Sequence, residues 1–327
     1  MYAIELDGFG GPDVMRWTEA PDPEVKPGEV LIEVIAAGVN RADIMQREGK
    51  YPPPAGASNI LGLECSGRIV QLGDGVTDWK VGDPVCALLS GGGYAQRVAV
   101  PATQVLPIPP DVDPVAAAGL PEVAATVWSN IVMTAGLKKG QLLLAHGGGG
   151  GIGTMAIQVG KQLGARVAVT AGSDEKLAHC RRLGADIGIN YKTEDFVAVV
   201  AGEGGANVIL DNMGAAYLTR NVEALAPHGN LVIIGMQGGA TGELNIAALL
   251  GKWGSVTATN LRNRPTTGPY SKAEVIASVR EHMWPAVAAG DIIPVISAEV
   301  PITEAGRGQE LLSSPDTFGK VVLTVPE

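Results

Sequence analysis

The sequence predicts an α/β fold in which a doubly wound parallel sheet follows a mostly β region, and three observations support this prediction. A chain of 327 residues is long enough for two domains. From about Leu142 to Asn260, short apolar segments alternate with helical ones, which is typical of a parallel sheet covered on both faces. Before about Leu120, Gly and Pro instead separate short β-rich segments.

The N-terminal region contains several segments with strand character. The first of them, MYAIELDGFG, alternates side chains as a strand does. The others lie between turn residues: GEVLIEVIAAGVN (28–40), SGRIVQLG (66–73), DPVCALL (83–89) and YAQRVAVP (94–101). After them, the segment from Glu122 to Ala135 is expected to form a helix that joins the two regions.

The central region contains six expected strands, each followed by a turn or a helical segment. They are LLLAH (142–146), RVAVTA (166–171), DIGIN (186–190), NVILDN (207–212), NLVIIG (230–235) and SVTAT (255–259). Six strands with crossover helices match a doubly wound sheet that binds nucleotides.

The C-terminal region is expected to return to the N-terminal one. Its predicted elements are a helix from Ser271 to Ala288, a strand over 294–301, a helix from Thr303 to Leu312 and a strand over 320–325. The simplest placement packs these elements against the N-terminal β region. We therefore expect one discontinuous domain formed by residues 1–121 and 263–327, and a dinucleotide-binding domain formed by residues 122–262.

Five consecutive glycines, Gly147 to Gly151, follow the first strand of the central region. A dinucleotide fingerprint needs glycine at i, i+2 and i+5 for a tight turn, for close approach of the pyrophosphate and for packing of helix on strand. Gly148, Gly150 and Gly153 fit this spacing, and starting at Gly147 in place of Gly148 fits a second one. Helical periodicity follows, so backbone N–H groups of a helix N-terminus are expected at the phosphates.

The residues after the second strand of the central region favour NADPH over NADH. NAD sites usually carry an acid at the end of that strand, where it binds the ribose 2′-hydroxyl. Here Gly172 and Ser173 follow the strand; Ser173 is expected to cap the next helix and Asp174 to lie in its first turn. Ser173, Lys176 and Tyr191 suit an extra 2′-phosphate, although Lys176 could also be an ordinary solvated lysine.

The composition disfavours several classes of protein. No apolar run approaches the ~20 residues that cross a bilayer and no export signal is visible, so we expect a soluble, cytoplasmic protein. The three cysteines, Cys65, Cys86 and Cys180, are too widely spaced for a disulfide framework or a four-cysteine zinc lobe. The net charge of −10 disfavours nucleic acid as the main partner.

Many ordered segments resemble the medium-chain dehydrogenase/reductase superfamily, and within it the zeta-crystallin-type NADPH quinone oxidoreductases of the stress-inducible branch. These segments are GVNRADIMQREGKYPPPAGASNILGLECSGRIVQLGDGV, PVCALLSGGGYAQ, LPEVAATVW, TAGSDEKLAHCRRLGAD, INYKTEDF and FGKVVLTV. The resemblance covers nearly the whole chain. It implies a GroES-like catalytic domain, a Rossmann dinucleotide-binding domain and a homodimer joined through the strand over 255–259.

The chain departs from the zinc-dependent members of that superfamily, which place a Cys ligand near the end of the AAGVN strand and a Gly-His-Glu downstream. Here GVNRAD has no Cys, and the second position is occupied by Gly62, Leu63 and Glu64. Leu63 cannot ligate a metal, and the four histidines lack ligand spacing. We therefore expect no catalytic metal, and reduction of an electron-poor acceptor in place of alcohol oxidation.

The resemblance also implies site residues. Asn40 and Tyr51 are expected to act as catalytic residues near the nicotinamide, although Asn40 could simply shape a loop and Tyr51 could be a packing aromatic. Close relatives have Ala-Ser where this chain has Gly149 and Gly150, so a hydroxyl contact is absent here. With the fingerprint, cofactor contacts are expected from Asn40, Thr126, Gly147, Gly148, Gly150, Gly151, Ile152, Gly153, Gly172, Ser173, Lys176, Tyr191, Asn212 and Gly235.

The expected activity is zinc-independent, NADPH-dependent reduction of quinones or related small electrophiles in a cleft between the domains, driven by proximity and orientation. An enoyl-thioester or enone reductase of the same superfamily is the alternative, since it needs the same cofactor. A non-catalytic protein that binds NADPH or RNA is a further alternative, which the acidic charge disfavours.

Overall fold

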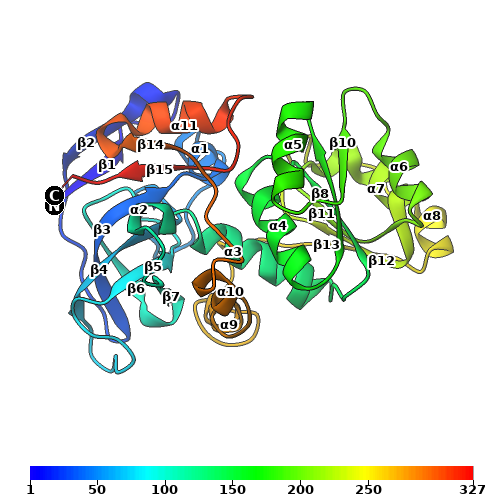
Figure 1. The fold of residues 1–327 in the computed structure, drawn as a ribbon. Coiled ribbons are helices and arrows are strands. Elements are labelled where there is room, and N and C mark those ends of the chain that lie inside the picture. Colours follow the sequence, from blue (N-terminus) through cyan, green and yellow to red (C-terminus); the bar gives the residue numbers. More distant parts are fainter. Residues whose placement is uncertain (327) are drawn as a thin grey trace. The chain divides into compact units, whose positions relative to one another are not determined.

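The computed structural model describes residues 1–326, which form two compact units (Figure 1). Unit 1 consists of residues 1–125 together with the chain from Leu261 onward, and unit 2 is Thr126–Asn260. The fold is mixed α/β, with a parallel Rossmann-like sheet in unit 2 and a mostly antiparallel sheet in unit 1.

Unit 1 is built on a seven-stranded sheet with the order β14-β15-β3-β4-β5-β7, in which β6 also pairs with β3. A separate two-stranded sheet holds β1 (Tyr2–Leu6) and β2 (Met15–Glu19). The strands of the larger sheet are β3 (Glu29–Gly38), β4 (Glu64–Leu72), β5 (Pro84–Leu88), β6 (Arg97–Pro101), β7 (Val105–Pro107), β14 (Ile296–Pro301) and β15 (Lys320–Thr324).

The pairing of β15 with β3 positions the residues of greatest interest in unit 1. The two strands are antiparallel, with Val322 opposite Gly38. Alternate residues of β3, including Val30, Ile32 and Val34, are buried in the core because successive side chains point to opposite faces of the sheet. The start of β15 therefore lies beside the chain that leaves the end of β3.

The helices of unit 1 are short, and the long helix predicted over 271–288 is divided. Its first part, α9, is capped by Ser271, whose hydroxyl accepts from Glu274 N–H at 3.1 Å. A π-helical turn, η5 (Val279–Met283), separates α9 from α10, near Pro285, which lacks an N–H for regular helical bonding. The helices are α1 (Arg41–Arg47), α2 (Pro114–Ala117), α3 (Pro121–Val127, which crosses into unit 2), α9 (Lys272–Ser278), α10 (Trp284–Ala288) and α11 (Ala305–Ser313), with 3-10 turns η1 (Pro12–Val14), η2 (Ala102–Gln104) and η6 (Ile302–Glu304).

Unit 2 contains a six-stranded, wholly parallel sheet with the order β10-β9-β8-β11-β12-β13. Its strands are β8 (Leu142–His146), β9 (Arg166–Ala171), β10 (Ile187–Asn190), β11 (Ala206–Asp211), β12 (Leu225–Ile233) and β13 (Ser255–Ala258). All six predicted strands are confirmed, although β12 begins before the predicted residue 230. The strand order reverses between β8 and β11, and such sheets bind ligands beyond the carboxyl ends of their strands at this point.

Helices cover both faces of the parallel sheet (Figure 1). On one side lie α4 (Gly151–Gln162) and α5 (Asp174–Arg182), and on the other α6 (Phe196–Gly202), α7 (Leu218–Ala224) and α8 (Ile246–Gly251). The unit also contains a π-helical segment, η3 (Trp128–Thr134), and a 3-10 turn, η4 (Gly214–Tyr217). Among the described residues, no helix is both long enough and apolar enough to span a bilayer.

Candidate functional site

The glycine run forms a tight turn between β8 and α4. Gly147 has a φ of +72°, a conformation that glycine adopts without strain. A Cβ on Gly148 would lie 2.7 Å from the Cβ of Val169, and a Cβ on Gly153 would lie 2.5 Å from Gly148 Cα. Glycine is therefore required at Gly147 because of the backbone conformation. It is required at Gly148 and Gly153 because there is no space for a side chain.

Gly150 differs from these neighbours because it has room for a side chain. It precedes α4 with extended backbone (φ −87°, ψ 172°), and a Cβ there would meet only Gly147 O, at 3.5 Å. No side chain among the described residues caps the N-terminus of α4. The free N–H groups and the positive end of a helix bind phosphate groups, and the space at Gly150 leaves the N-terminus of α4 accessible. The turn therefore fits the pyrophosphate of a dinucleotide.

A chain of buried hydrogen bonds supports this turn. Gly147 N–H donates to Thr170 Oγ1 at 3.3 Å, and Thr170 Oγ1 lies 3.1 Å from His146 Nδ1. His146 Nε2 lies 2.7 Å from Asn221 Oδ1, an acceptor, so the neutral ring carries its proton on Nε2 and accepts from Thr170 on Nδ1. Burial lowers the pKa of His146 to about 4, and the ring is therefore neutral at pH 7.

The start of α5 has the predicted local structure. Ser173 caps the helix, and its hydroxyl oxygen accepts from Lys176 N–H at 3.3 Å. Asp174 lies in the first turn, where its Oδ1 accepts from Asn190 Nδ2 at 3.0 Å. The predicted cap and first-turn acid are both confirmed, and Asp174 is engaged within the protein.

Two side chains lie against the backbone at Gly172. A Cβ on Gly172 would lie 2.5 Å from the hydroxyl oxygen of Tyr191 and 3.5 Å from Cε of Lys192. Lys176 lies in the first turn of the helix that begins two residues later. The strand end where NAD enzymes carry an acid is thus bordered by the phenol of Tyr191 and by Lys192, which suits a phosphate. Sequence reasoning missed Lys192, since nothing in its neighbourhood distinguishes it from a surface lysine.

Asn212 and Gly235 follow β11 and β12 at the carboxyl edge of the sheet. A Cβ on Gly147 would lie 3.0 Å from Asn212 Nδ2, and one on Gly235 would lie 2.8 Å from Asn212 O. Asn212 Oδ1 is buried and has no hydrogen-bond partner among the described residues. A bound ligand could satisfy this atom, so the site fits a cofactor here as well.

Thr126 lies in α3 at the start of unit 2 and is buried. Its carbonyl oxygen accepts from Ser129 Oγ at 3.3 Å and from Asn130 Nδ2 at 2.7 Å. These bonds fix the backbone of the helix at Thr126. A contact between the Thr126 side chain and the cofactor stays a prediction.

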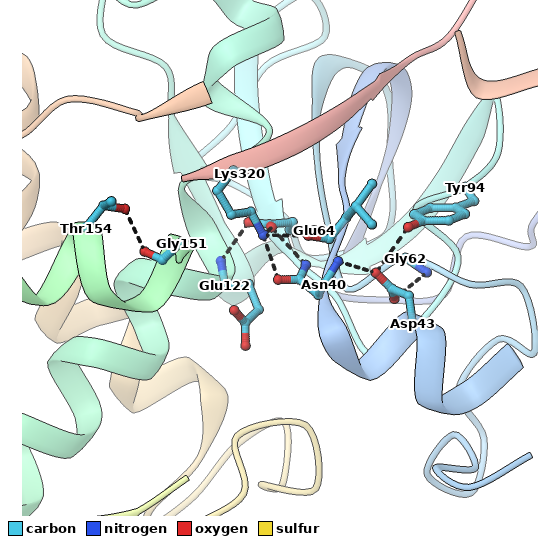
Figure 2. A network of polar contacts seen from close by, with 10 residues as sticks. Asn40, Asp43, Gly62, Glu64, Tyr94, Glu122, Gly151, Thr154 and Lys320 are labelled. Carbon is cyan, nitrogen blue, oxygen red and sulfur yellow. Dashed lines mark hydrogen bonds and ion pairs between the residues drawn. The ribbon is translucent and has the colours of Figure 1, made fainter. Parts of the chain in front are cut away.

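In unit 1, Asn40 lies within a buried polar network (Figure 2). Its Oδ1 accepts from Lys320 Nζ at 2.6 Å, and its Nδ2 donates to Glu64 Oε1 at 2.9 Å. Lys320 Nζ also lies 2.7 Å from Glu64 Oε1, in an ion pair whose side chains are 5% and 0% exposed. Sequence reasoning missed Lys320, because a lysine at the start of an apolar strand usually faces solvent.

Asp43 holds the backbone of Asn40 at the start of α1 (Figure 2). Its Oδ2 accepts from Asn40 N–H at 2.7 Å and from the Tyr94 hydroxyl at 3.2 Å, and its Oδ1 accepts from Gly62 N–H at 3.2 Å. Burial raises the pKa of Asp43 to about 6, although these N–H groups and the charge of Lys320 oppose the rise. Asp43 thus binds the backbone, and the side chain of Asn40 turns to Lys320 and Glu64.

Tyr51 lies in the loop after α1 and stacks with a buried arginine. The guanidinium carbon of Arg262 lies 5.3 Å from the centre of the Tyr51 ring. Arg262 Nε donates to Ser90 O at 2.9 Å, and its Nη2 donates to Gln46 Oε1 at 2.6 Å. Because Gln46 belongs to α1, Arg262 connects the Tyr51 loop to the helix that begins after Asn40. Sequence reasoning also missed Arg262, whose partners come from distant segments.

The positions of the zinc ligands in related enzymes do not offer a zinc site here. Leu63 is apolar, and Glu64 is bound to Lys320 and Asn40. Burial raises the pKa of the Cys65 and Cys86 thiols far above their usual range. Within residues 1–326, no group of three or more His, Cys, Asp or Glu side chains could hold a metal ion.

Comparisons with known proteins agree with this architecture. A family described as alcohol dehydrogenase GroES-like domain matches residues 26–110, and one described as zinc-binding dehydrogenase matches residues 151–277. A 2-haloacrylate reductase of Burkholderia sp is 32% identical, over 99% of this chain and 98% of its own. A quinone oxidoreductase of Pseudomonas aeruginosa is 30% identical, over 98% of both chains. The crystal structure of an Escherichia coli quinone oxidoreductase complexed with NADPH has a TM-score of 0.87 and 29% identity, over 99% of this chain and 100% of that chain.

A parallel dinucleotide-type sheet and a GroES-like sheet in one chain define a class of two-domain oxidoreductases. The chain belongs to the medium-chain dehydrogenase/reductase superfamily, which has quinone oxidoreductase-like members.

Proposed function

We propose that this protein is an NADPH-dependent quinone oxidoreductase that works without zinc. The observation that carries the cofactor assignment is the turn at Gly147 to Gly153, which has no room for a side chain at Gly148 or Gly153 but has room for one at Gly150. Tyr191 and Lys192 lie beside Gly172, where NAD enzymes have an acid, and this supports NADPH over NADH. The Escherichia coli relative crystallised with NADPH supports the same assignment.

In this proposal, unit 2 holds the dinucleotide and residues of unit 1 contact the acceptor. When bound, NADPH supplies the hydride. Asn40 would orient ligand groups through its amide, and Tyr51 would position the acceptor or give it a proton. Because a quinone is already electron-poor, proximity and orientation supply most of the catalysis, and no metal is needed as an electrophile.

Steady-state oxidation of NADPH in the presence of ortho- and para-quinones tests the assignment. We expect turnover with at least one quinone, and a lower KM for NADPH than for NADH. A purified protein that binds NADPH but leaves both kinds of quinone unreduced would refute the quinone assignment. Addition of a zinc chelator is expected to leave the rate unchanged.

Reduction of an activated carbon–carbon double bond is the second candidate, and the 32% identity to a 2-haloacrylate reductase favours it. This reaction leaves a carbanion that needs a proton, whereas a quinone acquires its charge on oxygen. Comparing Tyr51→Phe with the wild type separates the two. A quinone reductase in which Tyr51 only positions the acceptor should lose less than about fivefold in kcat, whereas an enone reductase that uses Tyr51 as its acid should lose about 100-fold.

We further propose that the protein is a homodimer joined along β13, the last strand at one edge of the parallel sheet. Three large apolar side chains near this edge are strongly exposed: Ile246 (64%), Leu250 (68%) and Trp253 (71%). An unpaired strand edge beside apolar surface is unfavourable in water and is stabilised by pairing with a second copy.

Leu250→Asp is expected to shift the protein from dimer to monomer, because a buried carboxylate opposes association. Val81→Asp, at an apolar residue of unit 1 that is 63% exposed, is the matched control and should leave the dimer intact. Sedimentation equilibrium gives the masses. A wild-type mass equal to one chain would contradict the proposed dimer.

A further inference from the structure

The Lys320 ammonium has all of its protons engaged within the protein (Figure 2). Nζ donates to Val39 O at 3.0 Å, and it also contacts Asn40 Oδ1 and Glu64 Oε1 at the distances given above. An ammonium has three protons, so these three acceptors use them all. Lys320 therefore cannot give a proton to a substrate without breaking one of these bonds, and its role is not that of an acid.

Glu64 is engaged in the same way. Its Oε1 accepts from Lys320 and Asn40, and its Oε2 accepts from Glu122 N–H at 2.9 Å, in the first turn of α3. A Cβ on Gly38 would overlap the Glu64 carboxylate, lying 2.6 Å from its Cδ. The lack of a side chain at Gly38 thus leaves space for this carboxylate. The cost of removing the carboxylate from water is offset by Lys320 and by the N–H donors of Asn40 and Glu122.

We propose that Lys320 and Glu64 are positioning residues that fix the orientation of the Asn40 side-chain amide. A flipped amide would place its NH₂ against the ammonium and its oxygen against the carboxylate, so that two favourable contacts become two repulsive ones. One N–H of the Asn40 amide is bonded to Glu64, and one lone pair of its oxygen is bonded to Lys320. The second N–H and the second lone pair of the amide therefore keep a constant direction.

This orientation matters for the reaction proposed above, on which the inference rests. A fixed N–H can donate to the oxygen that gains negative charge when a quinone accepts a hydride. Donors that need no reorganisation stabilise developing charge more than mobile ones do. The ion pair would thus set the direction of one hydrogen bond, although neither of its members touches the substrate.

The test uses a neutral pair of similar size, Lys320→Met with Glu64→Gln, so that no charge is left buried alone. Asn40→Ala is expected to lower kcat about 100-fold, and the neutral pair to lower it at least tenfold, with less than a threefold change in the NADPH dissociation constant. In the Asn40→Ala background, the neutral pair should lower kcat by less than about threefold. Losses that multiply in the combined variant would overturn the inference, because they would show that the pair acts independently of Asn40.

A second measurement does not depend on turnover. In the ¹⁵N spectrum of the unliganded protein, the Asn40 side-chain proton that is bonded to Glu64, assigned with Asn40→Ala, should exchange slowly with solvent. The neutral pair should speed this exchange at least tenfold while the melting temperature stays within a few degrees of the wild type. Equal exchange in both proteins would overturn the inference. If the wild type reduces no quinone but the exchange result holds, the proposed function fails and the positioning of Asn40 stands.

Discussion

Gly153→Val is expected to weaken NADPH binding at least 100-fold, or about 2.7 kcal/mol. A side chain at Gly153 would overlap Gly147 O and lie 2.5 Å from Gly148 Cα, both backbone atoms of the turn that we assign to the pyrophosphate. Because backbone cannot yield as a flexible side chain can, α4 would be forced away from the turn. Titration of the purified variant with NADPH, followed by fluorescence, measures the dissociation constant.

Gly150→Ser is the matched control for this substitution, because it adds a side chain to the same turn. Apart from its chain neighbours, the nearest atom to a Cβ at Gly150 is Gly147 O, 3.5 Å away, and the backbone of Gly150 is extended. Serine there would cap α4, which adds only a few tenths of a kcal/mol relative to glycine. We expect an NADPH dissociation constant within about threefold of the wild type. Equal weakening by Gly150→Ser and Gly153→Val would contradict the steric argument.

His146→Gln is expected to change how stability depends on pH. The folded protein holds His146 neutral with a pKa of about 4, whereas an unfolded histidine has a pKa of 6.5. As pH falls from about 6.5 to about 4, the unfolded state gains a proton that the folded state does not, and the free energy of unfolding decreases by about 3 kcal/mol. The glutamine amide of the variant cannot titrate, so this decrease is absent from the variant.

The measurement compares urea unfolding of wild type and His146→Gln between pH 7 and pH 4. Asp43, with its pKa raised to about 6, contributes stability that is largest below pH 3.8 and is lost as pH rises through 6, but it titrates in both proteins. The difference between the two proteins therefore isolates His146. We expect His146→Gln to be the less stable at pH 7 and to gain about 3 kcal/mol relative to the wild type by pH 4. A difference that is constant with pH would show that the folded protein does not hold His146 neutral.

Local patterns were sufficient for much of unit 2. Apolar runs bounded by turn residues located all six strands, since a strand that is buried on both faces needs continuous apolar side chains. The cap at Ser173 and the first-turn acid at Asp174 were likewise predictable, because helix capping involves residues three positions apart. The π-helical turn η5 was not predicted, because apolar periodicity alone does not reveal a widened turn.

The glycine run shows where local reasoning stops. Spacing left two registers, starting at Gly147 or at Gly148. In the structure both residues are needed, Gly147 for its positive φ and Gly148 for its approach to Val169. Val169 belongs to β9, the neighbouring strand, and this contact follows from strand pairing and not from the glycine pattern.

The parallel sheet, the dinucleotide-type turn and the lack of the usual zinc ligands could be predicted without a structure, because each depends on residues close together in the chain. The family could be predicted because many ordered segments over nearly the whole chain resemble it. The side chains that surround Asn40 and Tyr51 could not be predicted in this way, because they come from distant parts of the chain. Lys320 is 280 residues away from Asn40, and the pairing of β15 with β3 brings them together. From the sequence, a lysine with no nearby partner is expected to be solvated. In the fold, Lys320 is buried and paired with the Glu64 carboxylate, which makes it part of the site.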